Sequence, residues 1–486
     1  MSALSALHVH FLETLKQVLS NPGFDAVADM ALRTQLQIAH RIIGRMLVNE
    51  AMVPELTAEA LKEYLAEVEG AHEFCQRHGI VTDAAARLRA LTSAAPTPDF
   101  KDLLPFVRDL QLQVNKIPGE EARAVRRNLV AVEARFSNKL LAALDPWLGP
   151  QVGVASSGAV HTRDIDEAAF NAFLAQAFPN EPDLRLAGYS FISGGHSKFT
   201  AKIGLQGGRS IPDSVIMRAD ASGTYGGVSV VDEFRLLQVL HRNGVTVPKP
   251  LAVDESGKAF GAKMMLVEAM PGDGIGHMFN LPAPNLAVSR DIATQLARLH
   301  RIPISEFGDK FDGAKQTNQE KALSWLDQSY TTFKALNRAS PVYETAFHWL
   351  RENVALNDRA RTLVHGDYGL NNILIHQDRV STILDWEFAH IGNPIYDLGY
   401  FYFQAESLAP WREFADAYAK AGGFVPTQAQ LDYAIVFAAT RLGVMVCQSE
   451  AAFEAGAFKT AGAAASNTGY HETSIQRISG VLERVL

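Results

Sequence analysis

The feature that most constrains this chain is an acidic motif that lies beside two short apolar segments late in the sequence. Residues 365–372 read HGDYGLNN and directly follow the apolar residues 362–364. Asp385 follows a second apolar segment at residues 380–384. Both segments have the composition of short strands. One acidic loop would be a weak signal, but a strand, His-x-Asp-x-x-x-x-Asn, a second strand and an Asp in this order form a specific pattern.

The residue types in this motif point to metal-assisted chemistry on a hydroxyl group. Asn372 and Asp385 offer hard oxygen ligands, which suit magnesium, an ion that keeps waters and shares its shell with substrate phosphates. Asp367 lies five residues before Asn372 and can orient a hydroxyl and accept its proton. Phosphoryl transfer needs this combination of a base, metal ligands and charge neutralisation.

The bulk composition excludes several other classes of protein. With 486 residues, 47% hydrophobic and 20% charged, the chain has room for two or three globular domains. Its net charge of −8 gives no basic surplus for binding nucleic acid. Cys75 and Cys447 have neither metal-ligand nor disulfide spacing, so we interpret them as buried thiols. The sequence shows no signal peptide and no apolar run of about 20 residues, so we expect a soluble cytoplasmic protein without a membrane partner.

Residues 1–150 are predicted to be helical. Leu129, Val132, Phe136 and Leu140 recur at three- and four-residue steps, as a buried helix face requires. The region has no clustered acids or Gly-rich loop, so we interpret it as a packing domain through which a homo-oligomer could form. A substrate-covering role is the alternative. A Gly- and Ser-rich linker follows at residues 148–162, and then a short helix at 164–177 with Asp164 as its N-cap.

The middle of the chain is predicted to form a β-sheet, and the remainder to be mainly helical. Beyond Gly272 two short strands interrupt the helices, around 362–364 and 380–384. The stretch SGGHS at residues 193–197 reads as a turn that allows close backbone approach. The predicted strands are residues 184–192, 199–205, 215–218 and 263–268, and the clearest helices are residues 231–240 and 292–300.

The segments LVHGDYGLNNIL at residues 363–374, LDWEFA at 384–389 and GNPIYDL at 392–398 resemble the aminoglycoside phosphotransferase family. They are most similar to the branch that includes phosphotransferase domains fused to acyl-CoA dehydrogenases. The resemblance covers about residues 180–480. It implies an α+β, bilobal protein-kinase-like fold, preceded by an all-α domain. The implied domains are an N-terminal helical domain at 1–150, a nucleotide-binding small lobe at 163–270, and a large lobe at 271–486 that carries the catalytic loop, the metal and the acceptor.

The resemblance also assigns roles within the motif. Asp367 would be the catalytic base, and Asn372 and Asp385 would bind Mg2+. His365 and Asp397 would be structural, shaping and holding the loop.

A second group of residues would bind the nucleotide. The glycines of SGGHS would lie over the phosphates, and Arg218 would take the place of the lysine that pairs with ATP in kinases. Glu233 would be its ion-pair partner, and residues 268–270 would form the hinge that holds adenine. The expected nucleotide-binding residues are Gly194, Gly195, Arg218, Glu233, Glu268 and Met270.

The implied function is an ATP- and Mg2+-dependent phosphotransferase that acts on a hydroxyl of a small molecule, such as a hydroxylated acid or its CoA thioester. An antibiotic phosphotransferase is one alternative, but residues 307–358 mix acidic and basic side chains instead of forming an acid-rich site for a polycation. Aromatic residues of this stretch could line an apolar acceptor site, although their helical spacing is more typical of a core. A catalytically silent nucleotide-binding module is the other alternative, and the presence of the base and both metal ligands counts against it. It is open whether Glu387 approaches the metal or stays solvated.

Overall fold

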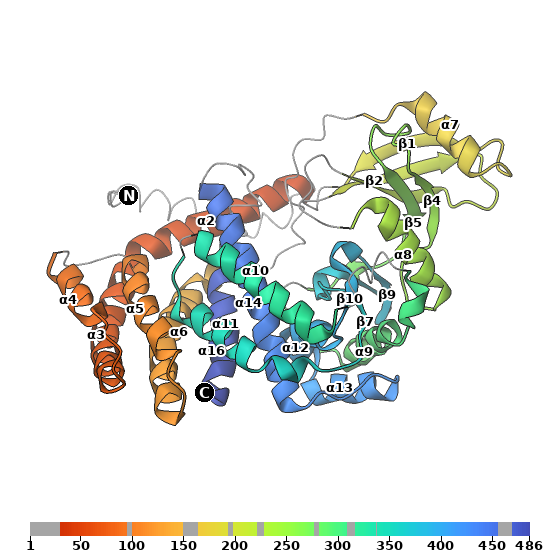
Figure 1. Cartoon of the computed structure of the whole chain (residues 1–486). Coiled ribbons are helices and arrows are strands. Elements are labelled where there is room, and N and C mark those ends of the chain that lie inside the picture. The colour runs from red at the N-terminus through yellow and green to blue at the C-terminus, as the bar shows by residue number, and fades with distance from the viewer. Residues whose placement is uncertain are drawn as a thin grey trace. The chain divides into compact units, whose positions relative to one another are not determined.

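The computed structural model forms two compact units, each built from segments that are distant in the sequence (Figure 1). The first unit contains Met1–Gly149, Gln319–Asp358 and Gln428–Leu486, and the second contains Pro150–Asn318 and Arg359–Thr427. The residues described are 30–94, 100–148, 164–192, 198–220, 228–276, 281–308, 316–336, 338–454 and 469–486. Most of the expected linker at 148–162, and the SGGHS turn with Gly194 and Gly195, lie outside these ranges.

The second unit begins with a five-stranded antiparallel sheet of order β1-β2-β3-β5-β4. Its strands are β1 (Arg185–Phe191), β2 (Lys198–Gln206), β3 (Ser214–Asp220), β4 (Pro250–Asp254) and β5 (Met264–Glu268). The four predicted strands are thereby confirmed, and β4 is an addition. Two helices accompany the sheet: α7 (Glu167–Ala177) and α8 (Val230–Arg242).

The start of α7 corrects one detail of the sequence prediction. Asp166, not Asp164, is the N-cap, because its side chain accepts a hydrogen bond from the Ala169 N–H. Asp164 instead accepts a hydrogen bond from the Tyr189 hydroxyl of β1. Both aspartates precede the helix, so the choice depends on a tertiary contact.

Strand β3 directs its side chains alternately to two hydrophobic cores. Val215 and Met217 pack in a core with residues of α7, while Ile216 packs in the core that contains residues of α8. Because side chains alternate along a strand, Arg218 lies on the same face as Ile216. The arginine is thus placed on the α8 side of the sheet.

The remainder of the second unit is a helical layer with short strands. It consists of β6 (Asp273–Gly274), α9 (Leu286–His300), β7 (Thr362–Val364), β8 (Ile373–His376), β9 (Arg379–Ile383), β10 (His390–Gly392), α12 (Ile395–Leu408) and α13 (Trp411–Lys420). The predicted strands at 362–364 and 380–384 are confirmed, but β6, β8 and β10 were not predicted. Strand β8 escaped prediction because Gln377 and Asp378 form its two-residue turn to β9 with φ of 51° and 56°, a conformation usually signalled by Asn-Gly or Asp-Gly.

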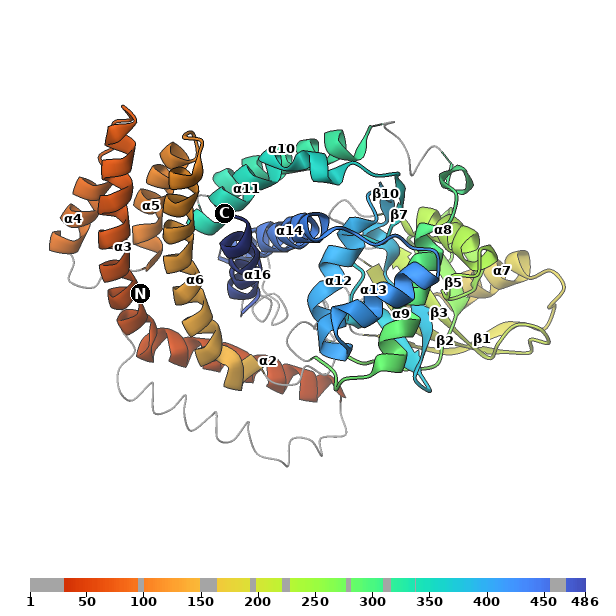
Figure 2. The same cartoon turned by 90° about the horizontal axis from the view of Figure 1, so that it is seen from below.

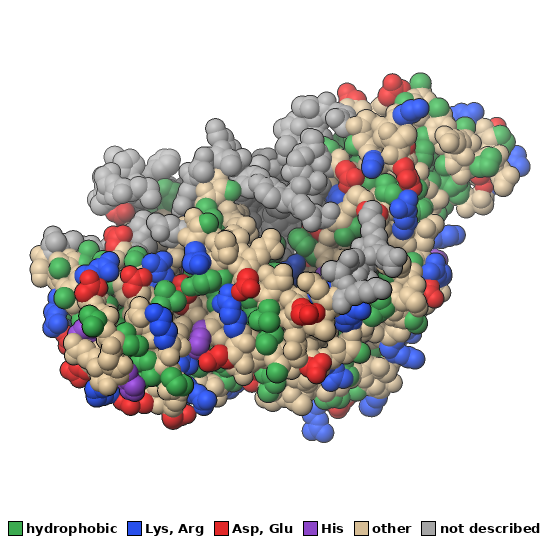
Figure 3. Space-filling model, viewed as in Figure 1, with side chains coloured by type: hydrophobic (Ala, Val, Ile, Leu, Met, Phe, Trp, Pro, Cys, Tyr) green, Lys and Arg blue, Asp and Glu red, His purple; other side chains and the backbone are tan. Residues whose placement is uncertain are grey.

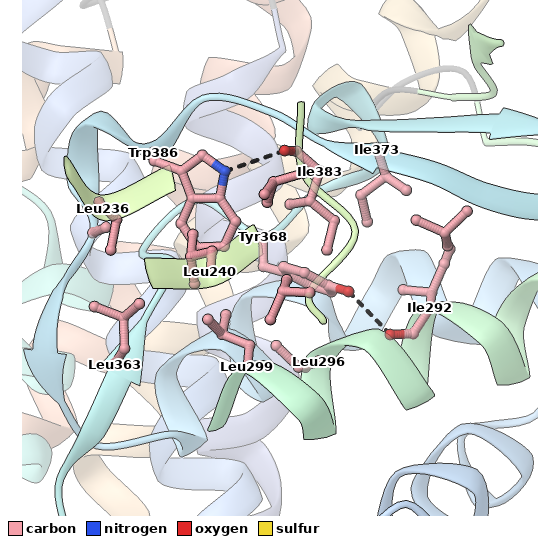
Figure 4. Packing of buried hydrophobic residues seen from close by; sticks show 14 of the residues in the cluster. Leu236, Leu240, Ile292, Leu296, Leu299, Leu363, Tyr368, Ile373, Ile383 and Trp386 are labelled. Carbon is pink, nitrogen blue, oxygen red and sulfur yellow. Dashed lines mark hydrogen bonds between the residues drawn. The ribbon is translucent and has the colours of Figure 1, made fainter. Parts of the chain in front are cut away.

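A buried apolar core lies beneath the HGDYGLNN motif (Figure 4). The motif's own Tyr368 is completely buried, and its hydroxyl donates to the Ile292 carbonyl of α9 at 3.0 Å. Trp386, next to Asp385, is also completely buried and donates from Nε1 to the Ile383 carbonyl at 3.1 Å. These two large side chains anchor both halves of the acidic motif to the core.

The first unit is helical throughout its described residues. Its helices are α2 (Met30–Ala51), α3 (Val53–Arg77), α4 (Ala84–Ala94), α5 (Phe100–Val114), α6 (Glu120–Leu148), α10 (Asn318–Ala335), α11 (Pro341–Glu352), α14 (Gln428–Glu454) and α16 (Tyr470–Val485). Within it, α3, α5 and α6 lie side by side (Figure 2). The predicted apolar face of α6 is confirmed, since Leu129, Val132, Phe136 and Leu140 are all buried.

This grouping of helices differs from the expected domains. Residues 319–358 and 428–486, expected in the large lobe at 271–486, pack with the N-terminal helices instead. The physical reason is that α11 and α16 bury apolar faces against helices of the N-terminal region, α6 among them. A boundary drawn along the sequence does not show which helices share a core.

Four aromatic residues of the stretch 307–358 belong to this helical packing: Trp325, Tyr330, Phe333 and Trp349. Phe333 is completely buried against Tyr343, with ring centroids 5.2 Å apart. Trp325 packs on Phe437 of α14 at 4.4 Å. These residues therefore serve the core of the first unit, as their helical spacing predicted. The charged residues expected nearby at 309–315 lie outside the described ranges.

Helix α14 and the surface each bear on the classes of partner. Within the described part of the chain, Gln428–Ala452 of α14 is long and apolar enough to cross a membrane, but 78% of its most apolar window is buried inside the protein, as in a core helix. On the face seen in Figure 3, acidic and basic side chains are interspersed among the coloured residues. This mixed surface agrees with the lack of a basic surplus in the sequence.

Candidate active site

The catalytic-loop motif begins where β7 ends, and Asp397 of α12 holds it in place. The Asp397 carboxylate accepts the backbone N–H of His365 at 2.8 Å and that of Gly366 at 2.9 Å. It also bonds to Nε2 of His300 at 3.1 Å. Burial alone would raise the pKa of Asp397, but the bonds from His300 and the loop outweigh it, so the pKa lies below its usual value. Asp397 is therefore an ionised anchor for the loop, in the structural position expected for it.

His365 bridges the two halves of the site. Its Nδ1 accepts the Asp367 N–H at 3.2 Å, so its Nε2 carries the proton that is donated to the Leu384 carbonyl at 2.9 Å. Both ring nitrogens are thus engaged within the protein, and the ring also packs on Trp386 at 4.5 Å. This agrees with the structural role expected for His365.

Gly366 allows the loop to turn directly above this bridge. Its φ is +81°, and a Cβ there would lie 2.5 Å from the Phe388 carbonyl oxygen. The position therefore requires glycine for two reasons, a left-handed backbone and a close approach.

Asp367, Asn372 and Asp385 lie close to one another, as the motif predicted. The Asn372 amide nitrogen donates to Asp367 Oδ2 at 2.7 Å and to the Asp367 carbonyl at 2.9 Å. The Leu384 N–H donates to the Asn372 carbonyl at 2.8 Å, which places Asp385 beside this pair. Asp385 adopts the left-handed conformation, with φ of 64°, which is uncommon for a residue other than glycine.

These residues fit a magnesium ion. The Asn372 amide nitrogen is committed to Asp367, so its oxygen is the atom that can bind a cation. Asp385 adds a carboxylate that is 36% exposed and therefore within reach of a ligand. Two hard oxygen donors with space for water and phosphate are what Mg2+ requires.

Arg218 of β3 connects the sheet to Asp385, one of the two expected metal ligands. Its guanidinium lies 3.3 Å from Glu233 of α8 and donates to Asp385 Oδ1 at 3.1 Å. Burial lowers the pKa of Arg218, but Glu233 and Asp385 raise it by more, so it lies above its usual value and the side chain is cationic. For Glu233, which is almost completely buried, burial raises the pKa. The expected Arg218–Glu233 pair is present, and the additional contact with Asp385 was not predicted.

A second cation, Lys198, was missed by the sequence reasoning. It is the first residue of β2, directly after SGGHS, and its side chain is 4% exposed. Its Nζ donates to Asp220 at 2.7 Å and to the Val228 carbonyl at 2.8 Å. Asp220 also accepts the Val230 N–H, at the start of α8. Lys198 thus connects the start of β2 to the start of the helix that carries Glu233, and its place directly after SGGHS in the sequence was the available signal.

The expected adenine hinge lies at the end of β5. Glu268 is half-buried, and its N–H donates to the Lys249 carbonyl at 2.9 Å. Met270 is half-buried two residues further on. The structure places both residues after the strand, as predicted, and their part in binding adenine stays a prediction.

A small antiparallel sheet with a buried Arg–Glu pair, joined to a loop that brings together Asp367, Asn372 and Asp385, is the arrangement expected of a kinase-like phosphotransferase. The profile described as "Phosphotransferase enzyme family" matches residues 189–432, half of the chain. The chain belongs to this family. A Ralstonia eutropha protein provisionally assigned as an aminoglycoside phosphotransferase has the same fold, with a TM-score of 0.55 and 19% identity over 66% of this chain and 99% of its own.

The curated relatives belong to the branch predicted from the sequence. Acyl-CoA dehydrogenase family member 11 of Rattus norvegicus is 29% identical over 186 residues, which are 36% of this chain and 23% of that protein. Family member 10 of Mus musculus is 28% identical over 218 residues, 42% of this chain and 20% of that protein. The chain thus spans about a fifth to a quarter of the length of these relatives.

Proposed function

We propose that this protein is an ATP- and Mg2+-dependent phosphotransferase that phosphorylates a hydroxyl group of a small molecule. The observation that carries the proposal is the joint placement of Asp367, Asn372 and Asp385 around one loop, with Arg218 bonded to the last of them. A base, two oxygen ligands and a cation at one place are the parts that phosphoryl transfer requires.

Each of these residues has a distinct task in the proposed reaction. Asp367 accepts a hydrogen bond from the acceptor hydroxyl and takes its proton as the hydroxyl oxygen attacks the γ-phosphate. Arg218 neutralises the phosphates, and Glu233 keeps its guanidinium extended toward them. Asn372 and Asp385 hold Mg2+, which, when bound, shields the charge that develops on the phosphate oxygens.

The Arg218–Asp385 contact is consistent with a site awaiting its nucleotide. Both side chains have a stronger partner in the loaded enzyme, since phosphate is a bidentate ligand for arginine and Mg2+ for the carboxylate. We infer that nucleotide binding exchanges this ion pair for these two interactions. Until then, the Arg218–Asp385 ion pair holds the buried guanidinium in place, together with an aspartate whose backbone is in the left-handed conformation.

For the acceptor we propose a hydroxylated acid or its CoA thioester. The names of the curated relatives support this, because acyl-CoA dehydrogenases act in the chemistry of acyl thioesters. An aminoglycoside is the alternative, and a polycation of this kind would favour an acid-rich site. The coloured face in Figure 3 presents acidic and basic side chains together.

An acceptor screen tests the proposed function. Purified full-length protein is given Mg2+ and ATP labelled at the γ-phosphate, with separate panels of hydroxy acids, hydroxyacyl-CoA thioesters, sugars and aminocyclitols. We expect Mg2+-dependent transfer of label to the hydroxy acids or their thioesters. Transfer to aminocyclitols alone would replace the acceptor proposal by the antibiotic alternative. Tight binding of Mg2+ and ATP without transfer to any panel would favour a catalytically silent module.

A further inference from the structure

Three side chains of different metal-binding types meet in the first unit, whereas the candidate active site belongs to the second. Cys447 and Glu450 lie three residues apart on one face of α14, and His471 lies at the start of α16. One ligand atom from each residue lies within 4.8 Å of the other two. We refer to Cys447, Glu450 and His471 as the α14–α16 cluster. The sequence spacing gave no hint of it, because His471 is 24 residues from Cys447.

The distances within the cluster suit a tetrahedral cation. Cys447 Sγ lies 3.7 Å from His471 Nδ1. Zinc binds sulfur at about 2.3 Å and imidazole nitrogen at about 2.0–2.1 Å, so a tetrahedral angle separates these two ligand atoms by about 3.6 Å. The observed pair already has this separation. A carboxylate oxygen of Glu450 lies within 4.8 Å of both of these atoms.

Burial and neighbouring charges set the electrostatics of the cluster. Cys447 is completely buried, and burial, with a smaller effect of Glu450, raises the pKa of its thiol to about 12. The Glu450 carboxylate is 19% exposed. Its cationic neighbour is Arg338, whose guanidinium lies 3.8 Å from a carboxylate oxygen of Glu450. Nearby, Arg45 pairs with Glu472 at 2.7 Å and so balances that second carboxylate. A divalent cation would add positive charge where a thiol, a half-buried carboxylate and an imidazole converge.

We propose that Cys447, Glu450 and His471 bind one zinc-type divalent cation that cross-links α14 to α16. Binding breaks the S–H bond of Cys447 and forms a metal–sulfur bond, and the displaced proton passes to solvent. His471 binds through the lone pair of its neutral ring and Glu450 through a carboxylate oxygen. The fourth position is taken by a solvent molecule. Thiolate and imidazole ligands select zinc over magnesium, so this site differs in its preference from the oxygen ligands Asn372 and Asp385.

Cobalt(II) tests the proposal directly, because it reports thiolate ligation through a near-ultraviolet charge-transfer band. Metal-free full-length protein is titrated with Co2+ and then with Zn2+. We expect one equivalent of Co2+ to produce the band and Zn2+ to abolish it. Magnesium-type oxygen sites give no such band. Its absence from the wild-type protein, including Co2+ binding without it, would overturn the proposal.

Matched variants test which residues bind the metal ion. Cys447→Ser should lose the band, whereas Cys75→Ser, which alters the other buried cysteine of the same unit, should keep it. Glu450→Gln changes a partly exposed side chain and should retain the band while weakening Co2+ at least about tenfold. Zn2+ should raise the melting temperature of the wild-type protein but not that of Cys447→Ser. A band that survives in Cys447→Ser, or unchanged Co2+ affinity in Glu450→Gln, would exclude the assigned site. ATP binding and phosphotransfer are separate readouts, so failure here leaves the proposed function standing.

Discussion

At the scale of single residues, the candidate site depends on hydrogen bonds that hold its polar side chains in place. The Asn372 nitrogen is bonded to Asp367, and both nitrogens of His365 are bonded to the backbone. Asp397 is ionised although it is completely buried, because it accepts two backbone N–H groups and a bond from His300. These contacts leave the Asp367 and Asp385 carboxylates as the groups placed to react or bind.

Asp367→Asn should abolish transfer but preserve nucleotide binding. The amide retains an oxygen that can accept the bond from Asn372, so the loop keeps its shape. It cannot take a proton, and loss of a general base typically costs about 10²–10⁴-fold in rate. Steady-state kinetics and calorimetric titration with Mg2+ and ATP measure the two effects. An equal loss of rate and nucleotide affinity would show that the base is misassigned.

Asp385→Ala should raise the Mg2+ concentration needed for nucleotide binding. The variant removes a carboxylate ligand, and we expect the half-saturating Mg2+ concentration to rise at least about tenfold. Binding of ATP is followed at increasing Mg2+. Glu387→Gln is the companion variant, and it decides whether that neighbouring carboxylate also approaches the metal. An unchanged Mg2+ dependence in Asp385→Ala would remove this residue from the site.

At the scale of secondary-structure elements, turns and helix ends depend on particular residues. The loop directly after β7 turns at Gly366. The N-terminus of α11 is bonded to a side chain from another helix. Glu133 of α6 accepts the Ser340 hydroxyl at 2.8 Å and the Val342 N–H at 2.9 Å. A carboxylate at a helix N-terminus interacts favourably with the helix dipole, but Glu133 is almost completely buried and its other oxygen has no hydrogen-bond partner among the described residues.

Gly366→Ala should destabilise the second unit. The left-handed backbone costs about 1–2 kcal/mol for any residue with a Cβ, and the contact with the Phe388 carbonyl adds to it. Gly244→Ala is the matched control, because Gly244 has φ of +74° in the same unit and a Cβ added there would meet no neighbouring group within 4 Å. Urea unfolding should show a larger loss of stability for Gly366→Ala. Equal losses of unfolding free energy in the two variants would mean that the loop shifts to relieve the contact with the Phe388 carbonyl, so that this contact does not destabilise the protein.

Glu133 should make the stability of the first unit depend on pH. Burial raises the pKa of Glu133 from 4.5 to about 7, although its bonds to Val342 and Ser340 lower it. Because the folded pKa is raised, the stabilising effect of the protonated form is complete below pH 4.5 and is lost as the pH rises to about 7. The difference in unfolding free energy between wild type and Glu133→Gln should therefore fall by on the order of 3 kcal/mol from pH 4.5 to pH 8. Urea unfolding across this range measures it, and a constant difference would contradict a buried titrating carboxylate.

At the scale of the whole molecule, the chain crosses between two cores several times. The catalytic loop and its sheet belong to one unit, while the segments at 319–358 and 428–486 pack with the N-terminal helices in the other. The N-terminal helices therefore form part of a core that later segments need. We therefore expect that they are not a separable addition to a phosphotransferase.

Deletion of residues 1–149 should prevent the remaining chain from folding normally. It would expose the faces of α11 and α16 that pack on helices of the N-terminal region, and large exposed apolar surfaces promote aggregation. We expect insoluble protein or soluble aggregates, measured by size-exclusion chromatography and thermal unfolding. A monomeric product with the melting temperature of the full chain would show that the N-terminal helices are dispensable.

The sequence by itself determined which residues form the loop, four of the five strands of the sheet, and the strands β7 and β9. Asp367, Asn372 and Asp385 could be predicted because they lie within about 20 residues, and because the predicted strands at 362–364 and 380–384 directly precede the motif and Asp385. Asp166 as the N-cap and the Gln377–Asp378 turn could not, because several local conformations compete there and tertiary contacts choose among them. Arg218 and Asp385 are 167 residues apart, and Glu133 and Ser340 are 207 apart. Such pairs, and the division into two units, depend on which apolar faces bury each other. The sequence does not show this, because amphipathic helices with similar patterns of apolar residues can pack against any of several partners.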